Sequence, residues 1–577
     1  MRYWQALAFC RDQLVQDEWR AVSLDRFSEA LGCTRRNAQL VIKRLVKEQI
    51  LDWQAGVGRG NLPQAKLLKR VDARLKRQAE HYLKAGQIEP AISLLPEQER
   101  SSFLGDYLAQ YQSKPSDSDI LQIPFYRATH GLDPISISRR TEHHIASYLY
   151  AKLIHFEHKS AEFRCDLAQF YQLRGDTLTV VLRKHLYFHD GSELTAHSVK
   201  AHFERLIGSC SGCRPLFEFI DEVIVDGERQ LRFISHQMPL LLPKLLAHTA
   251  MGISKESGEK RFGAGPFMLV EQNEWRTLLS VFPRYHGYRP WIDGIEIWNL
   301  GANAKEFTLH SDVAHGREVR KYGSEGFVAK RQWEPGCVYA MLNPQRHSWM
   351  TVTEHRAWLQ GLLSTMLPPS DLEGEVLAKA QGMMGQPDLS PASVEQAHPL
   401  LADLHLSLPR SPLTILTYQL STHITVAEQV ANQLSSVGIG CNIEVLPFPE
   451  FDNEKRLAEA DIIISGEVFS DDSDMSWLGW LLCTSSVNVC LSADNKHWLK
   501  RQAVEIMKQE TAECRLARFE SLERELLERG LYQPLYHTQQ DLNVSEHIAA
   551  PDLLANGWID FSQVVIMPKT NRRAASQ

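Results

Sequence analysis

The sequence lacks the features that mark several common protein classes. No stretch approaches the ~18 consecutive apolar residues of a membrane-spanning helix, so no membrane contact is expected. The 577 residues include only ten cysteines, and only Cys210 and Cys213 are closely spaced, without a second pair at zinc-ligand spacing. A disulfide scaffold and a zinc site are therefore not predicted, and the scattered cysteines fit a reducing compartment.

Catalytic motifs are also missing. The chain has no His-Glu-x-x-His, no phosphate-binding Walker loop, no nucleophile elbow and no evident catalytic pair of carboxylates. His143 and His144 are adjacent and would not face one ligand from a helix, and His189 fits a structural hydrogen bond within a turn. We therefore predict a protein that is not an enzyme and that uses no cofactor and no metal.

The N-terminus does not read as an export signal. The run Tyr3–Cys10 could be mistaken for a signal that ends in a lipid-accepting cysteine, but Gln5 interrupts it and bulky Phe9 stands where a small residue is needed. The spacing instead predicts an amphipathic helix, with an apolar face made of Trp4, Leu7, Ala8, Leu14 and Val15. A cytoplasmic location is expected.

Length and charge indicate at least two domains. The chain is well beyond the ~250–300 residues at which one hydrophobic core stops growing. Residues 1–115 carry 19 Lys and Arg against 13 Asp and Glu, whereas the remainder carries 44 against 57. A small basic module joined to a large acidic body points to nucleic acid or an anionic membrane as a partner of the module.

The basic module has the pattern of a helix-turn-helix. Ser23 can cap a short helix that Gly32 ends, and Thr34 can cap a second helix that reaches about Gln49. One side of the second helix is apolar and should face the core: Ala38, Val41, Ile42, Leu45 and Val46. The other side and the first turn offer groups suited to base edges and phosphates: Thr34, Arg35, Arg36, Asn37, Gln39, Lys43 and Lys47.

A hairpin completes the module. Leu51–Gln54 and Ala65–Leu68 read as two strands joined by a glycine-rich loop, with Arg59 at its tip. The glycines alone could belong to any loop and the basic face could simply be solvated, but helix, helix and wing in this order predict binding to double-stranded DNA. The module is assigned to residues 1–115, including a helical segment over 70–112 that is either a connector or a dimer contact, and 116–120 form a linker.

The body mixes strands and helices. Residues 178–182 form a β-branched strand, and a capped helix is expected over Thr195–Leu206 after the Asp190-Gly191 turn. Further on, a strand over Leu413–Tyr418, a helix over Val426–Leu434 and a strand over Cys441–Val445 predict a β–α–β unit. The body is therefore of α/β type.

These segments carry a family resemblance. The stretch Leu182–Ala196 resembles the signature of extracytoplasmic solute-binding proteins of the oligopeptide, dipeptide and nickel class. Other segments in the same order resemble that class as well: Gly263–Phe267, Tyr285–Tyr288, Ile292–Ile295, Asp461–Ile463 and Pro534–Tyr536. The resemblance implies a two-lobed, periplasmic-binding-protein-like α/β domain over 121–577. Its first lobe would combine about 121–270 with 530–577, its second would fill about 271–529, and the Gly263–Pro266 turn would lie near the first crossover.

A winged helix placed ahead of such a domain is similar to the SgrR type of transcriptional regulator. The matching patterns are Arg35-Arg36, Trp53–Ala55 with Gly58–Gly60, and Asn556–Phe561. This resemblance implies a cytoplasmic regulator of the sugar-phosphate stress response that controls a small RNA and transport genes. The solute-binding-like domain would then be the sensor, with a sugar phosphate as its ligand.

The ligand residues are less determined by the sequence. Peptide-binding members of the class carry an aromatic-x-Ala-Asp-Tyr-like run, but here the corresponding stretch has Glu467 in place of the leading aromatic and its Asp displaced, which argues against peptide binding. The pocket candidates are Trp291, Trp333, Asp471 and Trp477. Two other functions stay open at this point: the solute-binding component of an ABC transporter, and a scaffold that binds no ligand. The oligomeric state is open too.

Overall fold

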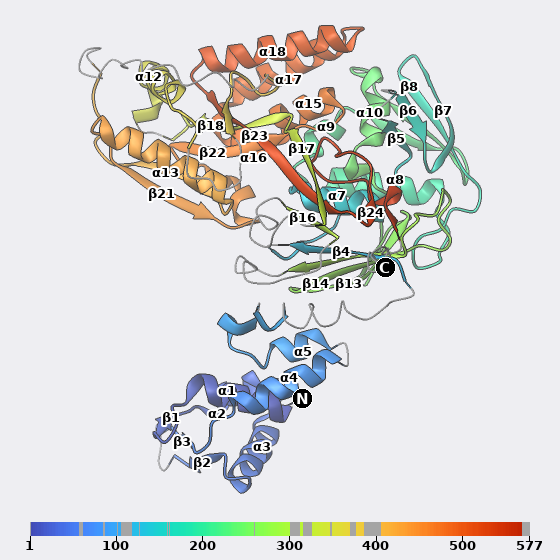
Figure 1. Cartoon of the computed structure of the whole chain (residues 1–577). Helices are drawn as coiled ribbons and strands as arrows, with labels where there is room; N and C mark the ends of the chain where they lie inside the picture. The colour runs from blue at the N-terminus through green and yellow to red at the C-terminus, as the bar shows by residue number, and fades with distance from the viewer. Residues whose placement is uncertain are drawn as a thin grey trace, which may run out of the picture.

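The chain folds into an N-terminal module and a larger, two-lobed body (Figure 1). The structure is a computed structural model, and it describes residues 2–56, 62–84, 87–100, 102–104, 118–125, 127–157, 160, 162–258, 260–299, 312–315, 326–346, 349–369, 377–385 and 406–567. This architecture confirms the predicted multidomain fold class. The first two residues of the predicted linker, 116 and 117, lie outside the described residues, and its last residue, Ile120, already begins a strand.

The N-terminal module is a winged helix with additional helices. A three-stranded sheet in the order β1-β3-β2 stands beside the helix pair α2 and α3. The elements are α1 (Arg2–Gln13), β1 (Arg20–Ala21), α2 (Leu24–Ala30), α3 (Arg35–Lys47), β2 (Leu51–Gln54), β3 (Gln64–Leu67), α4 (Asp72–Lys84) and α5 (Ile88–Ile92). The antiparallel pairing of β2 with β3 is the predicted hairpin.

One apolar core holds this module together. It joins α1, α2, α3 and the sheet to α4 and α5, so the segment after the wing packs as part of the module. The same cluster includes two tryptophans of the body, Trp275 and Trp298, which are 8% and 4% exposed. The module is thus seated on the body through a small apolar contact. Nothing in the described residues tests whether this segment also dimerises.

The first lobe contains two four-stranded sheets. One has the order β13-β14-β15-β4, in which β15 and β4 run parallel, and the other is the antiparallel sheet β7-β8-β10-β9. Its strands are β4 (Ile120–Phe125), β5 (Ile154–Glu157), β6 (Glu162–Cys165), β7 (Ala168–Arg174), β8 (Thr177–Leu182), β9 (Glu222–Val225), β10 (Gln230–Ile234), β11 (Lys255–Ser257), β12 (Lys260–Phe262), β13 (Phe267–Gln272), β14 (Arg276–Val281) and β15 (Gly294–Asn299). Its helices are α7 (Arg140–Leu149), α8 (Ala196–Gly208), α9 (Arg214–Phe217) and α10 (Leu242–Ala247).

The predicted start of the second lobe at about residue 271 needs correction. β14 and β15 follow that residue, yet they pair within the first-lobe sheet, where Gly294 lies opposite Ile120 in the parallel ladder. Pairing between strands more than 170 positions apart leaves no local signal in the sequence. The chain therefore leaves the first lobe only after Asn299.

The second lobe is built on parallel strands covered by helices. β20 pairs in parallel with β21 and β22, and β22 pairs antiparallel with β18. Its strands are β18 (Gly336–Leu342), β19 (Leu377–Lys379), β20 (Leu413–Tyr418), β21 (Cys441–Leu446) and β22 (Ile462–Val468). Its helices are α12 (Thr353–Ser364), α13 (Ser421–Ser436), α14 (Glu454–Leu457), α15 (Ser473–Cys483), α16 (Ser485–Cys490), α17 (Ala493–Met507) and α18 (Ala512–Glu528). The predicted β–α–β unit is β20–α13–β21.

Two long segments connect the lobes. β17 (Phe327–Trp333) leads through Glu334 and Pro335 directly into β18, and β23 (Tyr532–Ser545) runs antiparallel beside both. The first residues of β23 pair with β18 and β19 of the second lobe, while its last residues pair with β17 and β16 (Val313–His315). The chain then ends with β24 (Ile548–Ala549) and β25 (Val565–Ile566). These paired crossings are the hinge of the body.

The Gly263–Pro266 turn is not part of this hinge. It leads into β13, which stays in the first lobe. A Cβ atom on Gly263 would lie 2.0 Å from the carbonyl oxygen of Leu149, and one on Gly265 would lie 2.2 Å from that of Tyr148. Glycine is needed here because the two backbones approach too closely for a side chain. His189 bonds to the same turn: its Nε2 lies 3.2 Å from the oxygen of Gly265, the structural role predicted for it.

Candidate functional site

The first candidate site is the exposed face of α3. The turn before it is built as the sequence predicts: Ser23 accepts a hydrogen bond from the backbone N–H of Asp25 (3.2 Å), and Thr34 accepts one from Asn37 (3.5 Å). Gly32, between the two helices, has a φ of +54°, which glycine adopts without strain. Because both helices are capped, the start of α3 is held at a fixed angle to α2.

The two sides of α3 divide nearly as expected. Ala38, Ile42 and Leu45 are buried, but Val46, predicted to face the core, is 37% exposed. The exposed side carries Arg36, Gln39, Lys43 and Lys47, joined by Leu40, which is 59% exposed.

The charges of this face are available to a partner. Within the described residues, the side chains of Arg36, Lys43 and Lys47 make no hydrogen bond and no ion pair. Arg35 differs, because its guanidinium forms a bidentate ion pair with Asp25 of α2, with Nη2 at 2.5 Å from Oδ2. Arg35 therefore fixes the two helices to each other, a role that its position in the sequence did not reveal.

The wing is described only in part. β2 and β3 are present, and Lys66 of β3 lies 5.3 Å above the ring of Trp19. Arg59, the predicted wing contact, lies outside the described residues.

The second candidate site is a cleft between the lobes. It has a volume of about 2560 Å³, and its lining comes from α7, α9 and α10 of the first lobe and from α13, β22 and α15 of the second. The hinge forms its base through Glu334 and Thr538, whose side chains are hydrogen-bonded to each other. Arg140 from the start of α7 also bonds to Glu334, which ties the first lobe to the hinge.

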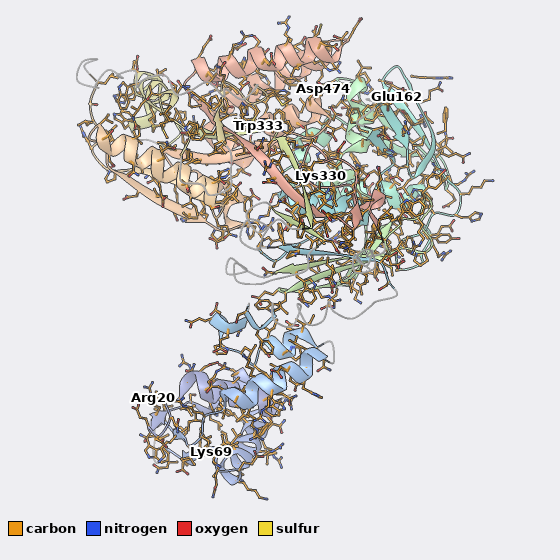
Figure 2. The ribbon with its side chains drawn as sticks, viewed as in Figure 1. Arg20, Lys69, Glu162, Lys330, Trp333 and Asp474 are labelled. Atoms are coloured by element: carbon orange, nitrogen blue, oxygen red, sulfur yellow. The ribbon has the colours of Figure 1, made fainter. Side chains whose placement is uncertain are left out.

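Most charges along the cleft are already paired. Arg127 binds Glu142 (2.7 Å), Arg205 binds Asp133 (2.8 Å), and Lys244 binds Asp472 (2.8 Å) across the lobes. Asp474, labelled in Figure 2, extends the last pair by accepting from Lys244 (3.2 Å) and Arg515 (2.8 Å). Paired groups hold the cleft together and offer a ligand little uncompensated charge.

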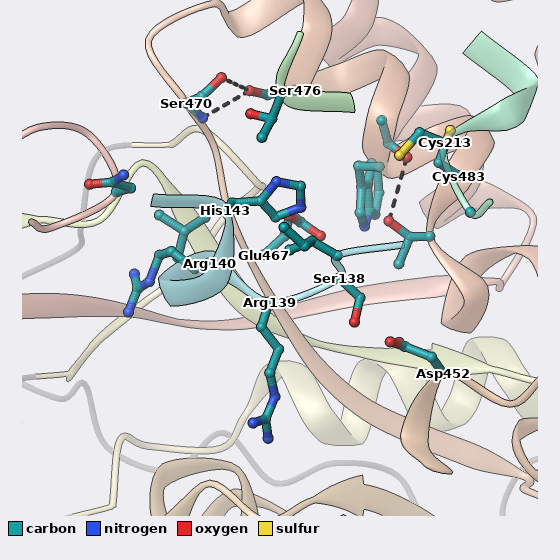
Figure 3. A pocket seen from close by; sticks show the side chains of 18 of the residues that line it. Ser138, Arg139, Arg140, His143, Cys213, Asp452, Glu467, Ser470, Ser476 and Cys483 are labelled. Atoms are coloured by element: carbon teal, nitrogen blue, oxygen red, sulfur yellow. Dashed lines mark hydrogen bonds between the residues drawn. The ribbon is translucent and has the colours of Figure 1, made fainter. Parts of the chain in front are cut away.

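A few titratable groups face the cleft without an ion pair among the described residues. Burial raises the pKa of Glu467 to about 7, although the backbone N–H of Val468 and the charge of Arg140 each lower it in part. Burial also lowers the pKa of His143 to about 4 and that of His423 to about 3. His423 is 4% exposed, and neither of its ring nitrogens has a hydrogen-bond partner. Figure 3 shows His143 and Glu467, from opposite lobes, among the side chains that line the pocket.

Family models match both parts of the chain. Residues 7–113 match the family described as sugar transport-related sRNA regulator N-term, and residues 166–307 match the middle part of bacterial extracellular solute-binding proteins of family 5. Curated relatives align with both parts of the chain, over at least 95% of its length. The protein of Pectobacterium atrosepticum named HTH-type transcriptional regulator SgrR is 24% identical, covering 96% of this chain and 97% of its own, and that of Yersinia pseudotuberculosis is 23% identical, covering 95% of each. The chain is thus similar to SgrR-type transcriptional regulators over nearly its whole length.

Solved structures support the fold of the SgrR-type body. The oligopeptide-binding protein AppA of Bacillus subtilis matches with a TM-score of 0.63 and 16% identity, covering 79% of this chain and 100% of its own. The ABC transporter-associated periplasmic binding protein DppA of Helicobacter pylori matches with a TM-score of 0.64 and 16% identity, covering 78% of this chain and 98% of its own. At such low identity, the similarity shows the two-lobed fold and leaves the ligand undetermined.

The structure distributes the four predicted ligand residues of this SgrR-type body unevenly. Only Asp471 lines the cleft. Trp291 is 71% exposed outside it, and Trp333 lies half-buried on β17 without reaching it (Figure 2). Trp477 is wholly buried, with its ring stacked on Phe519 at 5.6 Å. The structure therefore places none of the three tryptophans among the residues that line the cleft.

Sequence reasoning missed most of the groups that do line the cleft. These groups belong to no motif and come from α7, from α13 and from the loops after α7 and α10: Arg140, His423, Lys152 and His248. Glu467 alone gave a signal, because it departs from the aromatic residue of the peptide-binding pattern. Within the described part of the chain, no cluster of three His, Cys, Asp or Glu could hold a metal ion, and no helix is long and apolar enough to cross a membrane.

Proposed function

We propose that this protein is a DNA-binding transcriptional regulator whose two-lobed body senses a small molecule. The observation that carries the proposal is the exposed face of α3, where Arg36, Lys43 and Lys47 have no partner within the described residues. A capped helix that presents unpaired cations and an amide side chain fits the major groove of double-stranded DNA. A transport receptor would have no use for such a module.

The cleft supplies the sensing part of the proposal. Ligands of two-lobed binding proteins sit between lobes that move about their hinge, and closure converts binding into a shift between conformations. Here the cleft lies over β17, β18 and β23, so a ligand that contacts both walls would bias the hinge. To switch transcription, it must favour one arrangement by a few kcal/mol.

The seat of the N-terminal module offers a route from hinge to DNA. Trp298 of β15 and Trp275 in the turn before β14 belong to the first lobe and also to the core cluster of the winged helix. A change in the first lobe therefore reaches the orientation of α3 through packed side chains, without a flexible intermediate.

The finer parts of the proposal follow the family. We propose a sugar phosphate as ligand, a small RNA gene and neighbouring transport genes as targets, and the cytoplasm as location, where DNA is available. Binding without catalysis accounts for the cleft, since its ion pairs are structural.

Footprinting on the DNA upstream of the protein's own gene tests this function. The full chain should protect a site of defined sequence, and glucose 6-phosphate should change the protection while glucose should not. Small-angle scattering of the same samples should show compaction with the active ligand only. A chain that binds no DNA would overturn the proposal, and altered protection without compaction would overturn the closure mechanism.

A further inference from the structure

Lys152 is a cation of the cleft whose ammonium contacts no acid within the described residues. Lys152 follows α7 on the first-lobe wall, is half-buried and lines the cleft. Within the described residues its ammonium makes no hydrogen bond and no ion pair, in contrast to Arg127, Arg205 and Lys244 on the same walls.

Asp166 acts on this ammonium without a hydrogen bond or ion pair to it. Asp166 attracts the Lys152 ammonium, but its Oδ2 accepts the backbone N–H of Lys152 (3.0 Å) and its Oδ1 is bonded to Nε2 of His286 (2.7 Å). Both carboxylate oxygens are thus engaged elsewhere. Desolvation lowers the pKa of Lys152, the expected response of an ammonium taken out of water without a partner.

A second donor stands beside this lysine. Nδ1 of His248 accepts the backbone N–H of Ala250 at 3.1 Å, so a neutral ring must carry its proton on Nε2. Burial, with help from His143 and Lys152, lowers the pKa of His248 to about 3, which keeps the ring neutral. The two residues come from neighbouring backbone segments, because the N–H of Ile253 donates to the carbonyl oxygen of Ala151 (2.9 Å), and both line the cleft.

His143 adds a complementary group. Its ring donates to the backbone carbonyl of Ile137, which leaves the other nitrogen as an acceptor. The wall therefore combines an unpaired cation and an N–H donor with an acceptor suited to a hydroxyl group.

We propose that the Lys152 ammonium and the Nε2–H of His248 form the site for the anionic group, a phosphate or a carboxylate, of a small hydroxylated ligand. This inference rests on the proposed sensing function of the cleft. An arriving oxyanion supplies the missing counterion and accepts two charge-assisted or polarised hydrogen bonds, while His143 accepts from a neighbouring hydroxyl. Because the ammonium is already desolvated, little hydration is lost on binding, and charged ligands are favoured over their neutral analogues.

Calorimetric titration of the full chain tests the site. The probes are glucose 6-phosphate, gluconate, inorganic phosphate and uncharged glucose. Lys152→Met should weaken binding of the preferred anion about tenfold to a hundredfold, the range for one charge-assisted hydrogen bond, and should erase discrimination against glucose. Lys152→Arg should retain part of the affinity. Lys496→Met, which removes an exposed lysine of α17 with the same change of charge, should bind as the wild type does.

Thermal unfolding without ligand separates a binding defect from a folding defect. Lys152→Met should melt at or above the wild-type temperature, since it removes an uncompensated charge. Equal anion binding by Lys152→Met and the wild type would overturn the site while leaving the sensing function intact. A wild type that binds none of the three anions also overturns it, and the footprint with and without ligands then decides the sensing function separately. Preference for phosphate over gluconate, or the reverse, identifies the anion.

Discussion

The division of labour between Arg35 and Arg36 gives the sharpest prediction. Arg36 has no partner in the protein, so Arg36→Ala should leave the free energy of unfolding unchanged within about 0.5 kcal/mol. If Arg36 reads a guanine edge, the same change should weaken binding to the target by about 1–3 kcal/mol, or roughly 5- to 150-fold. Arg35 is held by Asp25, and both side chains are more than half exposed, so Arg35→Ala should lower stability by no more than about 1 kcal/mol.

The assay is fluorescence anisotropy on the target and on a shuffled duplex, over a range of salt. Arg36→Ala should lose affinity mainly for the target, whereas a phosphate contact would be lost equally on both duplexes and would lower the salt slope by about 0.9. Asp25→Asn serves as the matched control, because it frees Arg35 and should affect Arg35-dependent stability only. Unchanged target binding by Arg36→Ala, or a larger loss in Arg35→Ala at equal stability, would refute the assignment of the recognition face.

Three further results are expected. Acidification from pH 6.5 to 5 should lower Tm steeply in calorimetry, because six histidines stay neutral in the folded protein but take up protons on unfolding, which costs about 2 kcal/mol of stability each at pH 5. Burial holds their pKa values at about 3 to 4: His143, His144, His189, His202, His248 and His423. A Tm that does not change with pH would contradict these lowered pKa values. The pKa of Glu467 is near 7 instead of 4.5, so folding is disfavoured as pH rises from 4.5 to 7 and this carboxyl loses its proton more readily in the unfolded chain. In urea titrations at pH 8, Glu467→Gln should therefore be more stable than the wild type by about 1–3 kcal/mol. The control Glu428→Gln, at an exposed position, should not differ from the wild type. Oxidation by a small-molecule disulfide should join Cys213 of the first lobe to Cys483 of the second, which lie close together in Figure 3. Mass spectrometry should find this disulfide more often when ligand is bound. If only mixed disulfides with the oxidant form, the lobes stay apart.

Local patterns predicted the N-terminal module well. The caps at Ser23 and Thr34 and the turn at Gly32 act within four residues, and the structure confirms each of them. The hairpin and the β20–α13–β21 unit were predicted for the same reason, since alternation and helical spacing are read within one element. The limits of the apolar face were predicted less well: Val46 fits the apolar stripe of α3 but is 37% exposed, whereas its neighbour Leu45 is buried.

The sequence by itself therefore determined which elements form, which face of α3 is charged, and, through ordered motifs, the two-lobed class of the body. Only the tertiary structure decided where the lobes divide, because β15 joins β4 across more than 170 positions. It alone placed Trp477 in the core and Asp471 on the cleft wall, though they lie half a dozen residues apart. It also placed Lys152 and His248 on one wall of the cleft, with no ion pair to Lys152 among the described residues. Such choices depend on contacts between distant segments, and no spacing within a single segment encodes them.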